Sequence, residues 1–374
     1  MLKKQLFTPG PTEVPPRTLA ALSGQVLHHR KEGFKNLYGS AVKNLESIFR
    51  SAGEIFILTS SGTGAMETAV TNFTSPGDKA LVVVSGKFGQ RWEELLDTFG
   101  VKAEVLNYEW GSAADPADIE KALDEDGDIK AVFATLVETS TGTLHPVEEI
   151  ASIVKKSSAA LIIDAISGLG CDVIETDKWE IDAVVAGSQK ALMTPPGLGF
   201  ICVNEKAKEL YLNNKRKNYY WSLKKASKRQ TDNLTPYTPA VNLIAGLEIS
   251  LRMINSEGIE NVWERHRVFS EATRAALAEL GLKIFSKSPA RGLTTIELPE
   301  DISLIKELNE RFGIIVSGGQ AHLKGKIARL GHMGYCGKAD ILKLVSAIGM
   351  VTKNYSKLSA ALEAADKVFR KNGR

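Results

Sequence analysis

The chain has few cysteines and no long apolar run, and both shortages narrow the possible classes of protein. Only 3 cysteines occur in 374 residues, and none forms a CxxC pair or a cluster with histidine. We therefore predict neither a disulfide framework nor a metal site. No apolar run approaches the ~18 residues that a membrane span requires, and the N-terminus lacks the apolar segment of a secretory signal. We expect a protein of the cytoplasm with no membrane partner.

An excess of charge of one sign is also missing. The 47 basic and 44 acidic side chains give a formal net charge of +3. A balance this close to neutral gives no reason to expect a nucleic-acid partner. One basic run stands out, residues 214–230, and we interpret it as a solvated surface segment.

Continuously apolar segments alternate with amphipathic segments along most of the chain. Strands are predicted within residues 54–62, 79–86, 102–108, 129–138, 159–167 and 181–187, and helices within 36–52, 63–73, 88–100, 114–126 and 146–158. Apolar strands separated by helices predict an α/β fold, in which helices cover both faces of a mostly parallel sheet.

The two ends of the chain differ from this alternating part. Residues 1–16 are rich in proline and are expected to be extended. Residues 17–250 would form a large domain around the sheet. Residues 251–374 predict a smaller α/β domain, with short strands at 282–285 and 313–318 and closing helices at 338–350 and 356–370.

Polar residues gather where the predicted strands end. They are residues 60–63, 85–86, 138–140, 164 and 188–190. In open α/β sheets, ligands bind beyond the carboxyl ends of the strands. Five polar clusters on one edge therefore predict the rim of an active site.

Lys190 lies in an unusual loop between two apolar segments, residues 183–186 and 199–203. The loop "GSQKALMTPPGLG" is too rich in proline and glycine to form a helix. A lysine held between buried strands is suited to Schiff-base chemistry, because burial favours its neutral, nucleophilic form. Asp164 ends another apolar segment and needs a partner there. Taken singly, a solvated loop lysine and a helix-capping aspartate are the more ordinary interpretations.

Further polar and aromatic groups fit the same kind of site. The stretch "TSSGTGAMETA" predicts a small-residue loop before a helix, where backbone N–H groups with Ser61 and Thr63 would bind an anion. The stretch lacks the GK[ST] of a Walker loop and the GxGxxG fingerprint. Phe88 could stack on a flat ring or simply pack in the core. Arg329 could bind a carboxylate or form a surface ion pair.

Together these motifs resemble class V aminotransferases of fold type I, most closely the serine–pyruvate and alanine–glyoxylate aminotransferase group. The resemblance extends from "TPGPTEVP" to "ARLGHMG" and includes "SSGTGAME", "GQRW", "VETSTG", "DAISGLG", "GSQKAL", "PPGLGF" and "TPYTP". It implies the cofactor pyridoxal 5′-phosphate. It also implies a homodimer with shared active sites, acting on a small amino acid and a 2-oxo acid.

The resemblance also assigns roles to individual residues. Lys190 would form the Schiff base with the cofactor and move a proton, and Asp164 would pair with the pyridine nitrogen. Arg329 would bind the substrate carboxylate. The remaining cofactor contacts implied are Ser61, Gly62 and Thr63 with Gln189 at the phosphate, Phe88 on the ring, Thr139 on the side of the phenolic oxygen, and Thr235 and Thr238 reaching the cofactor of the partner subunit.

Some residues depart from the family pattern. Phe88 stands where the alanine–glyoxylate enzymes have tryptophan. His28, His29 and Arg30 lie in a segment that the family places near the mouth of the site, without a role that the sequence assigns. Arg30 and the basic run would leave aspartate or phosphonate donors possible, beside the favoured alanine and serine.

Two other functions stay open at this stage. A cysteine desulfurase or lyase of the same fold would have histidine before the lysine, where this chain has Gln189. It would also need a mobile late cysteine, and the one late cysteine is Cys336. The second alternative is a catalytically silent accessory subunit, against which the Lys190–Asp164 pair argues.

Overall fold

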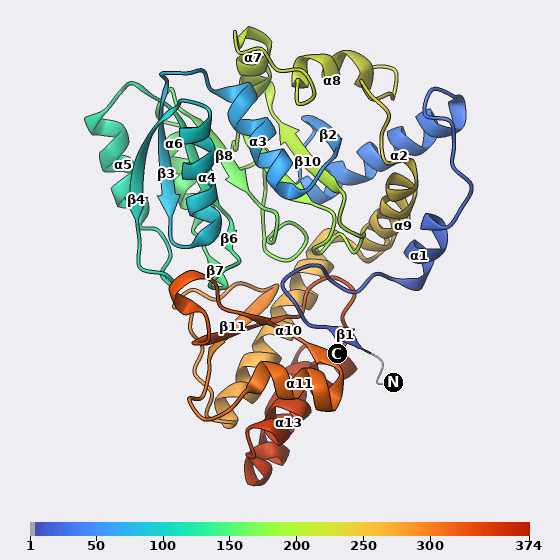
Figure 1. Cartoon of the computed structure of the whole chain (residues 1–374), viewed down its shortest axis with the longest axis vertical. Coiled ribbons are helices and arrows are strands. Elements are labelled where there is room, and N and C mark those ends of the chain that lie inside the picture. The colour runs from blue at the N-terminus through green and yellow to red at the C-terminus, as the bar shows by residue number, and fades with distance from the viewer. Residues whose placement is uncertain (1–3) are drawn as a thin grey trace.

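The computed structural model describes residues 4–374 and is built around a seven-stranded sheet (Figure 1). The strand order is β2-β10-β9-β8-β5-β3-β4. All neighbouring pairs are parallel except those of β10, which runs antiparallel to both β2 and β9. The strands are β2 (Glu54–Thr59), β3 (Lys79–Val84), β4 (Lys102–Asn107), β5 (Ile129–Thr135), β8 (Ala160–Asp164), β9 (Ala183–Gly187) and β10 (Leu198–Val203).

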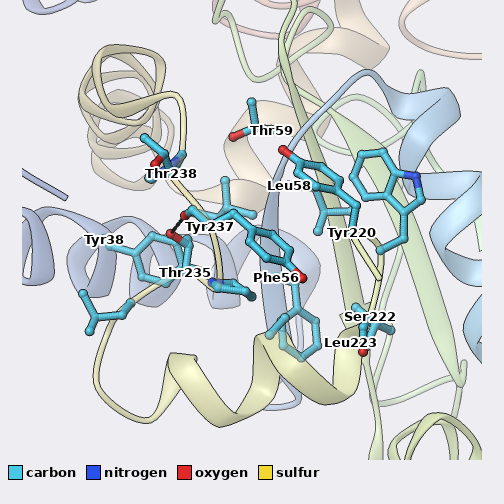
Figure 2. Close-up of a pocket in the computed structure, with 16 residues that line it drawn as sticks. Tyr38, Phe56, Leu58, Thr59, Tyr220, Ser222, Leu223, Thr235, Tyr237 and Thr238 are labelled. Atoms are coloured by element: carbon cyan, nitrogen blue, oxygen red, sulfur yellow. Dashed lines mark hydrogen bonds between the residues drawn. The ribbon is translucent and has the colours of Figure 1, made fainter. Parts of the chain in front are cut away.

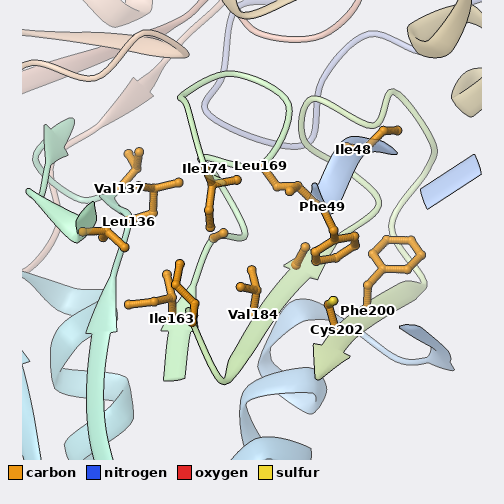
Figure 3. Close-up of a cluster of buried hydrophobic side chains, with 14 of the residues drawn as sticks. Ile48, Phe49, Leu136, Val137, Ile163, Leu169, Ile174, Val184, Phe200 and Cys202 are labelled. Atoms are coloured by element: carbon orange, nitrogen blue, oxygen red, sulfur yellow. The ribbon is translucent and has the colours of Figure 1, made fainter. Parts of the chain in front are cut away.

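Helices cover both faces of this sheet, and a strand's alternating side chains explain which helices meet which face. One buried cluster combines Ile163 and Val184 with α2, α5, α6 and α9. Figure 3 shows Ile163 and Val184 together with Ile48 and Phe49 of α2. The other combines Ile162 and Val185 with α3, α4, α7 and α8. The helices are α2 (Glu32–Phe49), α3 (Gly62–Phe73), α4 (Lys87–Thr98), α5 (Pro116–Glu125), α6 (Val147–Val154), α7 (Glu205–Asn213), α8 (Leu223–Gln230) and α9 (Val241–Glu257).

A further core lies below the sheet in Figure 1, among the orange and red elements. Its three-stranded antiparallel sheet has the order β11-β14-β13. The elements are α10 (Ile259–Glu279), β11 (Leu293–Glu297), α11 (Leu304–Phe312), β12 (Ile314–Ile315), β13 (Ser317–Gly318), a short 3-10 helix (Ala321–Leu323), β14 (Ile327–Gly331), α12 (Lys338–Val351) and α13 (Tyr355–Lys371). The division of the chain near residue 250 stays a prediction, since α10 contributes side chains to two of the clusters.

The N-terminal segment links this lower core to the large sheet. Strand β1 (Gln5–Leu6) pairs in parallel with β12, and Phe7 is buried in the lower core. The segment then passes Gly331, whose N–H donates to the carbonyl of Phe7 at 2.7 Å. It reaches the β9–β10 loop, where the Thr12 hydroxyl donates to the carbonyl of Lys190 at 2.9 Å. The segment ends in α1 (Pro16–Leu22). We call residues 7–12 the N-terminal strap.

The predicted α/β fold is confirmed, and several local predictions need correction. Residues 282–285 form no continuous strand, and only an isolated bridge joins Ile284 to Ile296. The predicted strand at 313–318 is divided into β12 and β13, because its two halves pair with β1 and β14. The basic run lies at the surface as predicted, and it contains a capped helix, α8, whose Ser222 side chain accepts from the N–H of Lys225. Short strands β6 (Val137–Glu138) and β7 (Thr143–Leu144) form an additional hairpin. Within residues 4–374, no helix is long and apolar enough to cross a membrane.

Gly331 is expected to be required for the close approach of the N-terminal strap. A Cβ atom at this position would lie 2.1 Å from the carbonyl oxygen of Thr8, so Gly331→Ala forces the two backbones apart. We predict a loss of about 1–3 kcal/mol in the free energy of unfolding, measured by denaturant titration. Gly127→Ala is the matched control, because nothing lies within 4 Å of its added Cβ. Equal stability of the two variants would contradict this account of the strap.

Candidate active site

The predicted polar clusters do share one edge of the sheet. Strands β2, β3, β5, β8 and β9 all run in the same direction, so their carboxyl ends meet there. Strand β8 ends at Asp164, and residues 188–190 follow directly after β9. Because β10 returns antiparallel, residues 188–197 join two neighbouring strands without a helix. This connection holds Lys190 at the edge.

Lys190 is buried, with 8% of its surface exposed. Its amine donates to the carbonyl oxygen of Pro9 in the N-terminal strap. Burial lowers the pKa of Lys190 to about 8; the charge of Asp164 opposes this shift, and the charges of Arg329 and Arg91 add to it. At this pKa roughly one fifth of the amine is neutral at about pH 7.4, far more than for a solvated lysine, and the neutral form is the one that attacks carbonyl compounds.

Asp164 is a buried carboxyl group at the end of β8. Its Oδ1 accepts from the N–H of Ile166 at 2.7 Å, and within residues 4–374 its Oδ2 has no hydrogen-bond donor. Burial raises the pKa of Asp164 to about 7, helped by the nearby charge of Glu138 and opposed by the Ile166 N–H and the charges of Arg91 and Lys190. A cationic N–H group placed against Oδ2 would favour the ionised form.

Arg329 and Thr139 contact each other near the same edge of the sheet. Arg329, on β14, donates from Nε to the carbonyl of Gly318 at 2.9 Å and from Nη1 to the carbonyl of Thr139 at 3.0 Å. Only 7% of Arg329 is exposed, and burial lowers the pKa of its guanidinium. The hydroxyl of Thr139 donates to that of Ser167 at 2.7 Å, in the loop after Asp164. The structure thus joins a residue of the lower core to the edge of the large sheet.

The N-terminus of α3 carries the predicted anion site. Ser61 is the residue before the helix, and its side chain makes no capping hydrogen bond. Gly62 is buried, and Thr63 accepts from Nη1 of Arg91 at 3.2 Å. The Arg91 guanidinium also lies over the ring of Phe88, 4.8 Å from the ring centroid. Arg91 therefore brings together two predicted site residues on different helices.

Thr235 and Thr238 lie beside the end of β2, in a pocket whose lining does not include Lys190 or Asp164 (Figure 2). They line this pocket with Tyr38, Tyr220 and Tyr237. The hydroxyl of Thr235 donates to the carbonyl of Tyr237 at 2.7 Å, whereas Thr238 is exposed. No contact within residues 4–374 joins these two threonines to Lys190 or Asp164.

Arg30 holds the loop that carries these threonines. Its Nη1 donates to the carbonyl of Thr235 at 2.6 Å, and its Nη2 donates to that of Pro236 at 3.2 Å. His28 and His29 stack on each other with their ring centroids 5.1 Å apart. These contacts give residues 28–30 a structural role. It is separate from the predicted substrate contact, for which the sequence assigned no single residue.

Sequence reasoning missed two contributors to the site, Arg91 and the carbonyl of Pro9, and left a third without a role. Arg91 follows Phe88 by three residues on a predicted helix, and this spacing could have placed both on one face. Glu138, buried next to Thr139, was placed on the predicted rim with residues 138–140 but received no role of its own. The carbonyl of Pro9 left no signal, because a backbone acceptor has no residue type.

The residues present fit pyridoxal phosphate. Asp164 offers the second oxygen of a buried carboxyl group to a pyridine N–H, and Lys190 offers a buried amine to an aldehyde. The free N–H groups at the start of α3 suit a phosphate. Within the described residues, the buried Oε1 of Gln189 has no partner. Lys190 would therefore bind the aldehyde of such a molecule, Asp164 its pyridine nitrogen, and the start of α3 its phosphate.

Comparison with known proteins agrees with this chemistry. The sequence model of the family described as aminotransferase class-V matches residues 5–337. The chain is 34% identical over 364 residues to a serine–glyoxylate aminotransferase of Methylorubrum extorquens, covering 93% of this chain and 90% of the relative. It is 40% identical over 381 residues to a soluble hydrogenase 42 kDa subunit of Anabaena cylindrica, covering 98% and 99%. Among solved structures, a ureidoglycine–glyoxylate aminotransferase of Bacillus subtilis superposes with a TM-score of 0.92 at 28% identity over 99% of both chains.

The lowered pKa of Lys190 predicts how its amine reacts in the protein without cofactor. Burial favours the neutral form, so the folded-state pKa of about 8 lies below the ordinary value of 10.5. Trapping of pyridoxal on Lys190 by borohydride reduction should rise about 10-fold per pH unit up to about pH 8 and then level off. Peptide mass spectrometry gives the extent at each pH.

Asp164→Asn is the informative comparison for this pH profile. It removes the anion that opposes the shift, so the Lys190 inflection should move to lower pH. An inflection near pH 10 in the unaltered protein, as for a solvated lysine, would show that the amine is not buried as described.

Proposed function

Because the chain belongs to the class V aminotransferases, which depend on pyridoxal phosphate, we propose that it transfers the amino group of alanine or serine to glyoxylate or pyruvate. The observation that carries the proposal is the meeting of Lys190, Asp164 and Arg329 at one edge of the sheet. Both relatives named above as aminotransferases have glyoxylate in their names, which supports a small acceptor.

The hydrogen bonds of Arg30 support a substrate with a small, neutral side chain. This arginine was the sequence's candidate for a second carboxylate, and two of its nitrogens already donate to Thr235 and Pro236. Arg329 has only part of its guanidinium in use, so it can still bind one carboxylate. One carboxylate-binding arginine suits alanine or serine better than aspartate.

Each of the three residues has a defined task in this proposal. When bound, pyridoxal phosphate supplies an electrophilic carbon and an electron-withdrawing ring. Arg329 would orient the substrate through its α-carboxylate. The neutral amine of Lys190 would take the proton from Cα as general base and hold it beside the substrate. Asp164 would accept the hydrogen bond of the pyridine nitrogen and keep that nitrogen protonated.

We also propose a homodimer in which the sites are shared. Thr235 and Thr238 line a pocket that does not include Lys190 or Asp164, although the family resemblance gives them a cofactor contact. A partner subunit that brings its own edge to this surface would reconcile the two. The exposed side chains of Tyr219, Tyr220 and Thr238 are consistent with a covered surface.

An accessory role is the second candidate function, because one similar protein is named as a hydrogenase subunit. The intact combination of Lys190, Asp164 and Arg329 favours catalysis. A desulfurase role is disfavoured by the position of Cys336, which lines a cavity with Gln5 and Asp340 rather than with Lys190.

A donor screen tests the proposed reaction. Each of the twenty amino acids is added to the cofactor-loaded protein, and the visible absorbance of the cofactor is followed. We expect alanine and serine to change the spectrum fastest, and glyoxylate or pyruvate to restore it. Lys190→Ala should lose the exchange by roughly 100-fold or more, as for a missing general base. A response to aspartate instead would refute the substrate class, and no response to any amino acid would favour the accessory role.

Asp164→Asn should separate cofactor binding from turnover. The amide cannot hold a protonated pyridine nitrogen, so we expect turnover to fall about 100-fold or more, the order seen when a charge-stabilising group is lost. The cofactor should remain bound through Lys190 and the start of α3. Asp128→Asn, an exposed aspartate, is the control and should keep full activity. Full activity of the Asp164 variant would contradict the assigned role.

A further inference from the structure

Glu138 is a fully buried carboxylate that the proposed reaction does not use. None of its surface is exposed, although a buried charge is costly unless it is paired and hydrogen-bonded. It follows β5 and lies in the short strand β6, next to Thr139. The surrounding residues must therefore supply interactions that stabilise this buried carboxylate.

Four donors surround the two oxygens of Glu138. Oε2 accepts from the N–H groups of Phe88 at 3.0 Å and Gly89 at 2.9 Å. Oε1 accepts from the N–H of Ser140 at 3.0 Å and from its hydroxyl at 2.6 Å. That hydroxyl in turn accepts from the N–H of Lys87 at 3.0 Å. Burial raises the pKa of Glu138, and the donors oppose this rise. Since all four partners donate, they match an ionised carboxylate.

These contacts fix the first turn of α4 from outside the helix. The residue before α4 is Gly86, which has no side chain to cap the free N–H groups. Glu138 and Ser140 together bind three consecutive N–H groups, those of residues 87–89. The negative charge also faces the positive end of the helix dipole. A Cβ at Gly86 would lie 2.4 Å from the Glu138 carboxyl carbon, so glycine leaves the space that this contact needs.

The fixed turn carries Phe88. Its backbone N–H is held by Glu138, while the guanidinium of Arg91 covers its ring. The neighbours of Glu138 also touch the rest of the site, because the Thr139 carbonyl accepts from Arg329. Backbone and ring of Phe88 are thus held by two charged groups of opposite sign.

We propose that Glu138 is a positioning residue, which fixes the backbone of Phe88 so that its ring is presented to the cofactor ring. This proposal rests on the cofactor-contact role of Phe88 in the proposed function. Glu138 acts through Phe88 and touches no reacting atom. The competing explanation is that Glu138 only stabilises the fold, in which case its loss would affect cofactor binding independently of Phe88.

A double-mutant cycle with Glu138→Gln and Phe88→Ala distinguishes the two explanations. The NH2 group of glutamine would face one of the two pairs of donors, so that pair loses its acceptor. The cofactor-free proteins are titrated with pyridoxal phosphate, and the dissociation constant and visible circular dichroism are recorded. We expect Glu138→Gln to weaken binding about 10-fold, as for disturbed hydrogen bonds to a charged group, and to reduce the visible dichroism. Glu104→Gln removes an exposed negative charge from β4 and is the matched control.

The double variant should bind the cofactor no more weakly than Phe88→Ala alone. Additive losses, or an unchanged dichroism in Glu138→Gln, would overturn the proposal. If Glu138→Gln does not fold, Ser140→Ala enters the same cycle, because it removes one donor to Glu138 without adding a buried amide. None of these measurements needs an amino donor. A wild-type protein that binds the cofactor but ignores alanine and serine would count against the proposed function alone.

Discussion

The burial of one amine, that of Lys190, is the constraint on which the arrangement of the site depends. Two segments distant in sequence must approach the β9–β10 loop that carries it: the N-terminal strap and the residues that follow β14. A Cβ at Gly10 would lie 2.6 Å from Nζ of Lys190, and one at Gly334 would lie 3.3 Å from its carbonyl. The carbonyl of Pro9 then gives the amine a partner that carries no charge. A carboxylate in its place would favour the ammonium form and suppress nucleophilicity.

The charges around that amine are balanced rather than paired one to one. Arg91 and Arg329 lower the pKa of Lys190, Asp164 opposes them, and Glu138 raises the pKa of Asp164. Burial is the largest cause of both shifts, and together with these charges it brings the pKa of Lys190 to about 8 and that of Asp164 to about 7. Neither is locked in one charge state by a single strong partner. A cationic ring nitrogen would pair with the carboxylate of Asp164, and a substrate carboxylate would pair with Arg329. Ligand binding would therefore change the charge states of the groups around Lys190.

The sequence was sufficient for the parts of the molecule that follow from periodicity and from strand direction. Apolar strands alternating with helices determined the sheet, and the polar residues at its carboxyl edge, Asp164 and Lys190 among them, followed from the parallel arrangement. Residues 282–285 were mispredicted as a continuous strand because an apolar pattern does not say how many residues pair with the neighbouring strand, here a single bridge from Ile284 to β11. The role of the Pro9 carbonyl and the outside cap that Glu138 gives to α4 could not be predicted, since both depend on contacts between segments more than 45 residues apart.

The direction of β10 explains why the lysine lies in a loop and not on a helix. A parallel neighbour would require a crossover of a dozen or more residues, usually a helix. A lysine at the start of that helix would be fixed from one side only. Because β10 is antiparallel to β9, both ends of residues 188–197 are fixed in adjacent strands. The hydroxyl of Ser188 donates to the carbonyl of Pro195 at 2.7 Å and closes the loop on itself. A loop anchored at both ends leaves Lys190 only its side-chain freedom, so its amine can move between partners while its backbone stays in place.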